Sequence, residues 1–127
     1  MPAVFGNTSS LKRWKWEWSM NYNLWLRRQL LVQAARENGF RVDEVPNKWR
    51  LYFWRKETDP RRYCSCDILT ATGFSNPSVH FIAIESHPEL PSNPGYHDPT
   101  NLDLQDLLQI ARPIFAGIYF SPPVTQT

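Results

Sequence analysis

The run Phe81-Ile82-Ala83-Ile84 is the most apolar stretch of this chain, and it constrains the fold more than any other feature. It lies in a segment from Val79 to Ser86 that has the length of a strand. Apolar side chains at consecutive positions are typical of a strand that is covered on both faces, at the centre of a sheet. The sequence therefore predicts a central strand over 79–86.

Hydrophobic periodicity predicts the elements around this strand. Apolar residues at helical spacing predict a helix from Met20 to Asn38, and Gly39 supplies its stop. The other predicted elements are, in chain order, an extended segment starting at Phe40, strands over 49–55 and 63–71, a helix from Thr100 to Pro113 and a strand over 114–120.

The 127 residues of the chain are a usual size for one domain. With 42% hydrophobic and 20% charged residues, the composition is that of a packed globule rather than of a disordered tail. An apolar final strand after a helix favours a mixed α/β layer. We therefore expect a single α/β domain over 11–121, of order αβββαβ, with a mixed central sheet flanked by helices and flexible ends at 1–10 and 122–127.

Aromatic residues are concentrated in two segments. In the first, Trp14, Trp16 and Trp18 alternate with charges, which predicts an extra N-terminal strand carrying three indoles on one face. Buried, this face would cap the core; exposed among cations, it would stack nucleic-acid bases. In the second segment, between Trp49 and Arg55, large side chains occupy both faces of the predicted strand.

Charge is divided unequally along the chain. Residues 1–62 carry 13 Lys and Arg against 6 Asp and Glu, whereas residues 63–127 carry Arg112 alone against 6 acids. A basic half predicts a surface that binds the phosphates of nucleic acid; alternatively, the two halves simply attract each other within the fold. The residues predicted to contact nucleic acid are Lys12, Arg13, Lys15, Arg27 and Arg28.

Three polar residues interrupt or end apolar strands. Asp67 lies inside the strand over 63–71, and Glu85 and His87 follow the central run two positions apart, on one face. If these strands pair so that the three side chains converge, Asp67 and Glu85 would bind Mg²⁺ or Mn²⁺, and the metal would support phosphodiester hydrolysis with His87 in the site. Alternatively, Asp67 pairs with Arg61 or Arg62, and residues 85–88 are a polar strand exit.

The chain resembles the core of the PD-(D/E)xK nuclease superfamily, and its resolvase-like members in particular, in three segments that follow a helix: Gly39-Phe40-Arg41-Val42, Asp67-Ile68-Leu69 and Phe81-Ile82-Ala83-Ile84-Glu85-Ser86-His87. The resemblance spans residues 20–120 and implies the same αβββαβ order. It also implies that Asp67 and Glu85 are the acids of the second and third core strands, with His87 at the position of the superfamily lysine. Cys66 stands where that superfamily normally has a proline. A histidine at the lysine position either ligates the metal or marks a site that has lost activity.

The only two cysteines are Cys64 and Cys66. This spacing is unsuited to a disulfide, which favours a reduced cytoplasmic location, as does an N-terminus without the apolar stretch of a secretory signal. With His80, His87 and His97 the cysteines would suggest zinc, but burial as small apolar side chains is the commoner role. No apolar run is long enough for a membrane span. No phosphate-binding loop motif occurs either.

Two classes of function therefore compete. The first is a nuclease-like nucleic-acid-binding protein that cleaves DNA or structured RNA with Mg²⁺ or Mn²⁺. The second is a non-catalytic interaction module, an accessory subunit of a larger assembly, whose Trp-rich N-terminus and proline-rich loop over 88–99 contact nucleic acid, a protein partner or a second copy. That loop contains four prolines and is predicted to be irregular. A third reading is a small chaperone or adaptor that dimerises.

Overall fold

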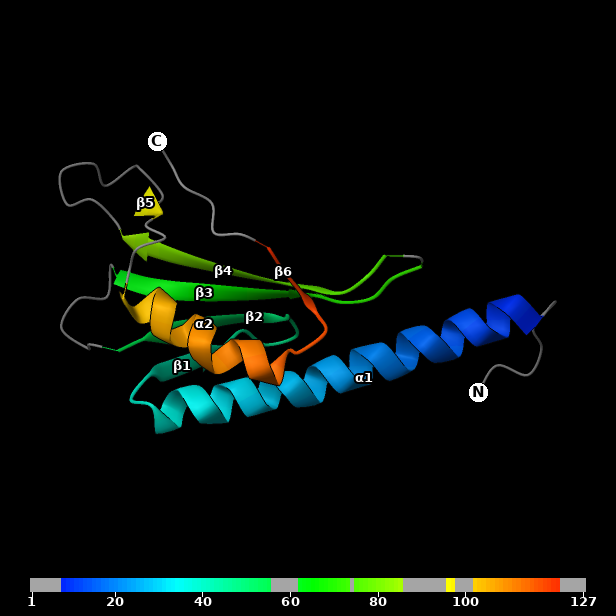
Figure 1. The fold of residues 1–127 in the computed structure, drawn as a ribbon, viewed down its shortest axis with the longest axis horizontal. Helices are drawn as coiled ribbons and strands as arrows, with labels where there is room; N and C mark the ends of the chain where they lie inside the picture. The colour runs from blue at the N-terminus through cyan, green and yellow to red at the C-terminus, as the bar shows by residue number, and fades with distance from the viewer. Residues whose placement is uncertain (1–7, 56–61, 74, 86–95, 98–101, 122–127) are drawn as a thin grey trace.

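The computed structural model of the chain describes residues 8–55, 62–73, 75–85, 96–97 and 102–121 (Figure 1). Its elements are, in order, α1 (Thr8–Glu37), β1 (Arg41–Glu44), β2 (Arg50–Trp54), β3 (Arg62–Leu69), β4 (Ser78–Glu85), β5 (Tyr96–His97), α2 (Leu102–Ile114) and β6 (Tyr119–Ser121). The chain is a single α/β domain, as expected.

The strands form one mixed sheet in the order β1-β2-β3-β4-β5, with antiparallel neighbours throughout, and β6 pairs with β4 in parallel. β4 pairs with β3 along one edge and with both β5 and β6 along the other. The predicted central strand is therefore confirmed. The short β5 lies within the segment 88–99, which was predicted to be irregular. That prediction is therefore wrong for Tyr96 and His97, which lie between Pro94 and Pro99 in the sequence.

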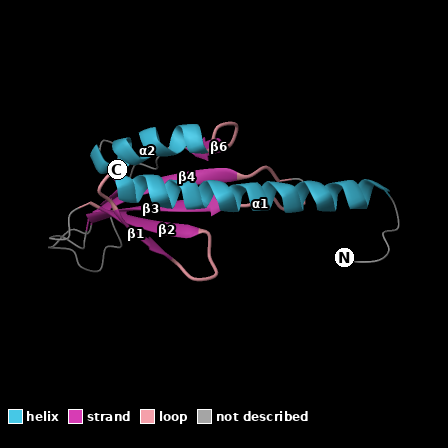
Figure 2. Cartoon of the chain, turned by 90° about the horizontal axis from the view of Figure 1, so that it is seen from below, coloured by secondary structure: helices cyan, strands magenta, loops and turns pink. Residues whose placement is uncertain are grey.

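Alternate residues of the strands face a core that both helices cover. Leu104 and Leu107 of α2 and Leu31 of α1 are fully buried in it, and Figure 2 shows the two helices running alongside each other over the strands. The strand residues of this core are Val42, Leu51, Phe53, Cys64, Cys66, Ile68, Val79, Phe81 and Ala83.

Both described helices lie against one face of the sheet, and no described helix lies against the other face of the central strand. Ile82 of β4 points to this second face and is half-buried. Its register partner Ser65 is buried. An apolar run thus marked a central strand without requiring a second helical layer.

The N-terminal tryptophans lie on a helix, not on an extra strand. α1 begins at Thr8 and contains Trp14, Trp16 and Trp18, although the helix was predicted only from Met20. Residues two apart on a helix are about 200° apart around its axis, so these three positions do not share a face. No glycine or proline interrupts residues 8–37, and nothing local therefore ends the helix early.

Two turns set the lengths of the helices and of the last strand. Gly39 has φ 87°, and the N–H of Phe40 donates to the carbonyl of Ala35, which confirms the predicted stop of α1. α2 continues one residue past Pro113, and a turn with Gly117 at φ 83° follows it. β6 therefore starts later than the predicted strand over 114–120.

A side-chain clamp fastens α1 to the far end of β3. The Asn21 side-chain amide donates to the carbonyl oxygen of Ala71 at 3.1 Å, and the Ala71 N–H donates to Asn21 Oδ1 at 2.8 Å. Ala71 follows β3 and is buried, so both of its backbone polar groups are satisfied by one side chain.

Candidate nucleic-acid interface

The strand register does not bring the two predicted metal-binding carboxylates together. Asp67 pairs with His80, whereas Glu85 pairs with Arg62 at the other end of the same two strands. A strand rises about 3.4 Å per residue, so the five positions from His80 to Glu85 span roughly 17 Å. The backbones of Asp67 and Glu85 are separated by about this distance. His87 lies outside the described residues. Within the described part of the chain, no three His, Cys, Asp or Glu residues form a group that could hold a metal ion.

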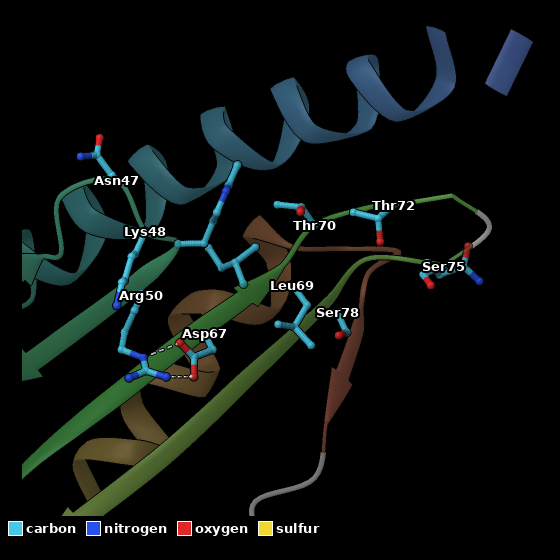
Figure 3. Close-up of a pocket in the computed structure, with 12 residues that line it drawn as sticks. Asn47, Lys48, Arg50, Asp67, Leu69, Thr70, Thr72, Ser75 and Ser78 are labelled. Carbon is cyan, nitrogen blue, oxygen red and sulfur yellow. Dashed lines mark hydrogen bonds and ion pairs between the residues drawn. The ribbon is translucent and has the colours of Figure 1, made fainter. Parts of the chain in front are cut away.

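Asp67 is paired with Arg50, whereas the sequence suggested Arg61 or Arg62 as its alternative partner. Arg50 lies opposite it on β2 and donates two hydrogen bonds, from Nε to Oδ1 at 2.7 Å and from Nη2 to Oδ2 at 3.0 Å (Figure 3). These bonds raise the pKa of Arg50 above its ordinary value. Both oxygens of the carboxylate thus accept from one guanidinium, and the pair is only partly exposed.

The arginines of α1 that were predicted to bind nucleic acid have other contacts. Arg28 is 2% exposed and its guanidinium donates to Glu44, while Arg27 donates to the carbonyl oxygen of Ala116 and to Asn23. Arg28 therefore stabilises the packing of α1 on β1 rather than presenting charge to solvent. The side chains of Lys12, Arg13 and Lys15 lie outside the described part of α1.

The two cysteines are buried in the core. Cys64 and Cys66 both lie on the helix-covered face of β3. Burial, together with the neighbouring Asp67 carboxylate, raises the pKa of Cys66 above its ordinary value. The burial of both cysteines among core residues fits the role of small apolar side chains.

Three aromatic side chains gather on the sheet face that lies opposite the helices. Tyr52 and Trp54 of β2 and Tyr63 of β3 have ring centroids 5.6–6.0 Å apart in every pairing. We call them the aromatic cluster. All three are half-buried, and the guanidinium of Arg41 lies 5.7 Å from the centre of the Trp54 ring. Burial raises the pKa of Tyr63, so its phenol stays neutral at physiological pH.

A polar pocket adjoins the aromatic cluster. It has a volume of about 660 Å³ and is lined by Arg50 and Lys48 at one side and by the ends of β3 and β4 at the other (Figure 3). Hydroxyl and amide side chains form part of its wall, namely Asn47, Thr70, Thr72, Ser75, Asn76 and Ser78. Asp67 and the apolar side chains of Trp49, Ile68 and Leu69 line the rest. Cations and hydroxyl groups are the side chains that proteins use to contact phosphate oxygens.

Part of this surface was visible in the sequence. The alternation of Arg50, Tyr52 and Trp54 marks one face of a strand that carries large side chains on both faces. The sequence instead predicted the stacking surface at Trp14, Trp16 and Trp18, where the alternation of Trp with charged residues indicated a strand. Tyr63 could not be added to the cluster without the pairing of β2 with β3.

No family profile, curated protein or solved structure matches this chain. The resemblance to the PD-(D/E)xK superfamily therefore remains a prediction. Among the described helices, none is long and apolar enough to cross a membrane.

Proposed function

We propose that this protein is a non-catalytic module that binds single-stranded nucleic acid on the open face of its sheet. The observation that carries the proposal is the aromatic cluster of Tyr52, Trp54 and Tyr63, which lies on a face that no described helix covers. Two arginines, Arg41 and Arg50, lie on the same face.

The chemistry of this face suits unpaired bases. Aromatic side chains on a sheet stack bases that are splayed out of a single strand, and each such contact contributes roughly 1–3 kcal/mol. A duplex offers no free base faces, so the cluster favours single strands. Because every base has a ring face, this mode predicts weak sequence preference.

The charges beside the cluster suit a phosphate backbone. Arg41, Lys48 and Arg50 are exposed and belong to the basic half of the chain, on β1, in the turn after it and on β2 respectively. Arg41 and Arg50 each form an ion pair on this face, with Asp43 and Asp67, so a phosphate would compete with these carboxylates for the two guanidinium groups. The polar pocket adds hydroxyl groups beside them. A strand that stacks on the cluster would pass Arg50 and enter the pocket with its phosphates towards Lys48.

The proposal is limited to binding. Both oxygens of Asp67 accept hydrogen bonds from Arg50, and the register places the Glu85 backbone at the other end of the β3–β4 pair. The described geometry thus supports the non-catalytic reading better than hydrolysis.

Fluorescence anisotropy with a labelled single-stranded 12-mer tests the proposal. Trp54→Ala should weaken binding about tenfold, since it removes one stacking surface worth about 1.4 kcal/mol. Trp16→Ala, which removes an exposed indole from α1, is the matched control and should bind as the unmodified protein does. Lys48→Ala should reduce the dependence of log K on log salt concentration by about one unit. Equal affinity of Trp54→Ala and the unmodified protein, or an affinity that does not change with salt, would show that this face is not the binding surface.

A further inference from the structure

A second cavity lies between α1 and the turn that joins β1 to β2. Its volume is about 480 Å³, and it is lined by Trp25 and Arg28 of α1, Glu44 of β1 and the turn residues 45–49. We call it the turn pocket. Cavities of this size commonly hold small organic ligands, so the volume is suited to a single heterocyclic ring system.

The turn is well defined and is shared with the polar pocket. The Lys48 N–H donates to the carbonyl oxygen of Val45 at 3.2 Å. Between them, Pro46 restricts its own φ and Asn47 adopts φ 60°, the combination found in a type II turn. Lys48 and Trp49 line both the turn pocket and the polar pocket. A single strand that follows the polar pocket therefore reaches the turn pocket by passing this turn.

Two indole rings form the apolar part of the turn pocket. The ring centroids of Trp25 and Trp49 are 5.9 Å apart, and the ring planes are perpendicular. Trp25 is exposed and Trp49 is half-buried. Two perpendicular rings form a corner, in which a flat ligand can stack on one indole while its edge contacts the other. The corner therefore suits a flat aromatic ligand.

The polar groups of the pocket have unused hydrogen-bonding capacity. A guanidinium has five N–H donors, and the described hydrogen bond from buried Arg28 uses Nη1 alone, with Glu44 as acceptor. Arg28 Nε has no hydrogen-bond partner. Glu44 Oε1 accepts from Arg28 and Gln29, whereas no described hydrogen bond reaches Oε2. Among the described residues, none pairs with the ammonium group of Lys48.

The charges of these groups select among flat ligands. Arg28 and Lys48 exceed Glu44 by one positive charge. A cationic ring would meet two like charges, and an aromatic acid would place its carboxylate beside Glu44. A neutral ring that has hydrogen-bond acceptors next to donors suits all three groups. Nucleobases have edges of this kind.

We infer that the turn pocket binds one unpaired guanine of the single strand proposed above. The inference rests on the proposed function and adds a base preference to it. Guanine has two neighbouring acceptors, O6 and N7, and this pair is the commonest specific target of cationic side chains, here Arg28 and Lys48. Its adjacent N1–H would donate to Glu44 Oε2. Adenine has an amino group in place of O6, so it would direct a donor at the cations.

Anisotropy titrations with two single-stranded 12-mers test the inference. Both are oligothymidines with one central purine, guanine in the first and adenine in the second, so they differ in the hydrogen-bonding edge and little in stacking area. The unmodified protein should bind the guanine 12-mer about tenfold more tightly. Glu44→Gln keeps an acceptor for Arg28 but replaces Oε2 with an amino group, so this preference should fall to about twofold or less. Urea denaturation establishes that the variant is folded.

A second variant tests the pocket without changing its hydrogen-bonding groups. Trp25→Leu removes one wall of the corner and should lower the guanine preference to the same extent as Glu44→Gln. Trp18→Leu is the matched control, because it removes another exposed indole from the same helix outside the pocket. This control should keep the full preference of the unmodified protein.

Trp54→Ala distinguishes this inference from the proposed function. It should weaken the binding of both 12-mers by the same factor and leave their ratio unchanged. Equal affinities for the two 12-mers, or a guanine preference that persists in both Glu44→Gln and Trp25→Leu, would overturn the inference and leave the open-face proposal intact. A guanine preference without any effect of Trp54→Ala would support the turn pocket and contradict the open-face proposal. Failure to bind either 12-mer would overturn both.

Discussion

Arg50 and Asp67 face each other across β2 and β3, and both oxygens of the carboxylate accept from the one guanidinium. Both residues line the polar pocket, on the sheet face that carries the aromatic cluster. Asp67 therefore holds in place, and partly neutralises, a cation that would otherwise meet a phosphate. The nuclease hypothesis assigns the same Asp67 carboxylate to metal binding. One substitution at Asp67 therefore distinguishes metal-dependent cleavage from non-catalytic binding.

We predict that Asp67→Asn strengthens the binding of single-stranded oligonucleotides several-fold. The substitution removes a negative charge and frees Arg50 to contact phosphate. The ion pair is partly exposed, so the free energy of unfolding should fall by no more than about 1 kcal/mol. Anisotropy titrations and urea denaturation measure the two effects.

The nuclease hypothesis predicts a different result for the same variant, a loss of metal binding and of cleavage. If Asp67 and Glu85 bind a divalent ion, Mg²⁺ or Mn²⁺ should raise the melting temperature of the unmodified protein, and Asp67→Asn should abolish that rise. Cleavage of a DNA substrate that appears only with the metal, and is lost in Asp67→Asn, would contradict the non-catalytic proposal.

We predict that Glu44→Ala lowers the free energy of unfolding by about 2–3 kcal/mol. Glu44 is 37% exposed, but its partner Arg28 is almost fully buried and would be left without an anion. The guanidinium lies 5.1 Å from the centre of the Trp25 ring, and its Nε has no hydrogen-bond partner. Urea denaturation measures the loss.

The neighbouring Asp43 supplies the control for this substitution. It pairs with Arg41 on the same strand, where both side chains are exposed. Asp43→Ala should therefore cost less than about 0.5 kcal/mol. Equal losses for the two variants would mean that burial of Arg28 does not determine the stability of this pair.

We predict that Cys66 makes the protein less stable at alkaline pH. Burial raises the pKa of this thiol above the value of 9.0 that holds in an unfolded chain. Between these two pKa values the unfolded chain loses a proton that the folded protein keeps. Stability is therefore full below pH 9 and falls above it, by up to about 1.4 kcal/mol per pH unit.

Comparison of the unmodified protein with Cys66→Ala isolates this contribution. Urea denaturation at pH 7 and pH 10 should show a smaller alkaline loss in the variant, whereas Tyr63, whose pKa is also raised, titrates in both proteins. A loss of the same size in the two proteins would assign the pH dependence to other groups.

Local patterns predicted most of the strands and the order of the elements. Alternation located β2 and β3, the apolar run located β4, and Gly39 located the end of α1, because each signal depends on residues close in sequence. The strand predicted at Trp14, Trp16 and Trp18 is wrong, since alternation of aromatic and charged residues is equally compatible with a helix that has no glycine or proline.

The candidate site depends on strand register, which no local pattern fixes. A shift of one residue between β2 and β3 would separate Arg50 from Asp67 and move Tyr63 away from Trp54. The register also decides that Asp67 meets His80 rather than Glu85. These contacts join residues that are 9 to 17 positions apart on neighbouring strands, and hydrophobic periodicity within one strand carries no information about them.

The clamp between Asn21 and Ala71 joins the long helix α1 to the segment that follows β3. Ala71 lies between Thr70 and Thr72, which line the polar pocket. Two hydrogen bonds to one residue fix orientation as well as position. This part of the pocket wall is therefore anchored to α1 by a side chain, at a point that no strand pairing reaches.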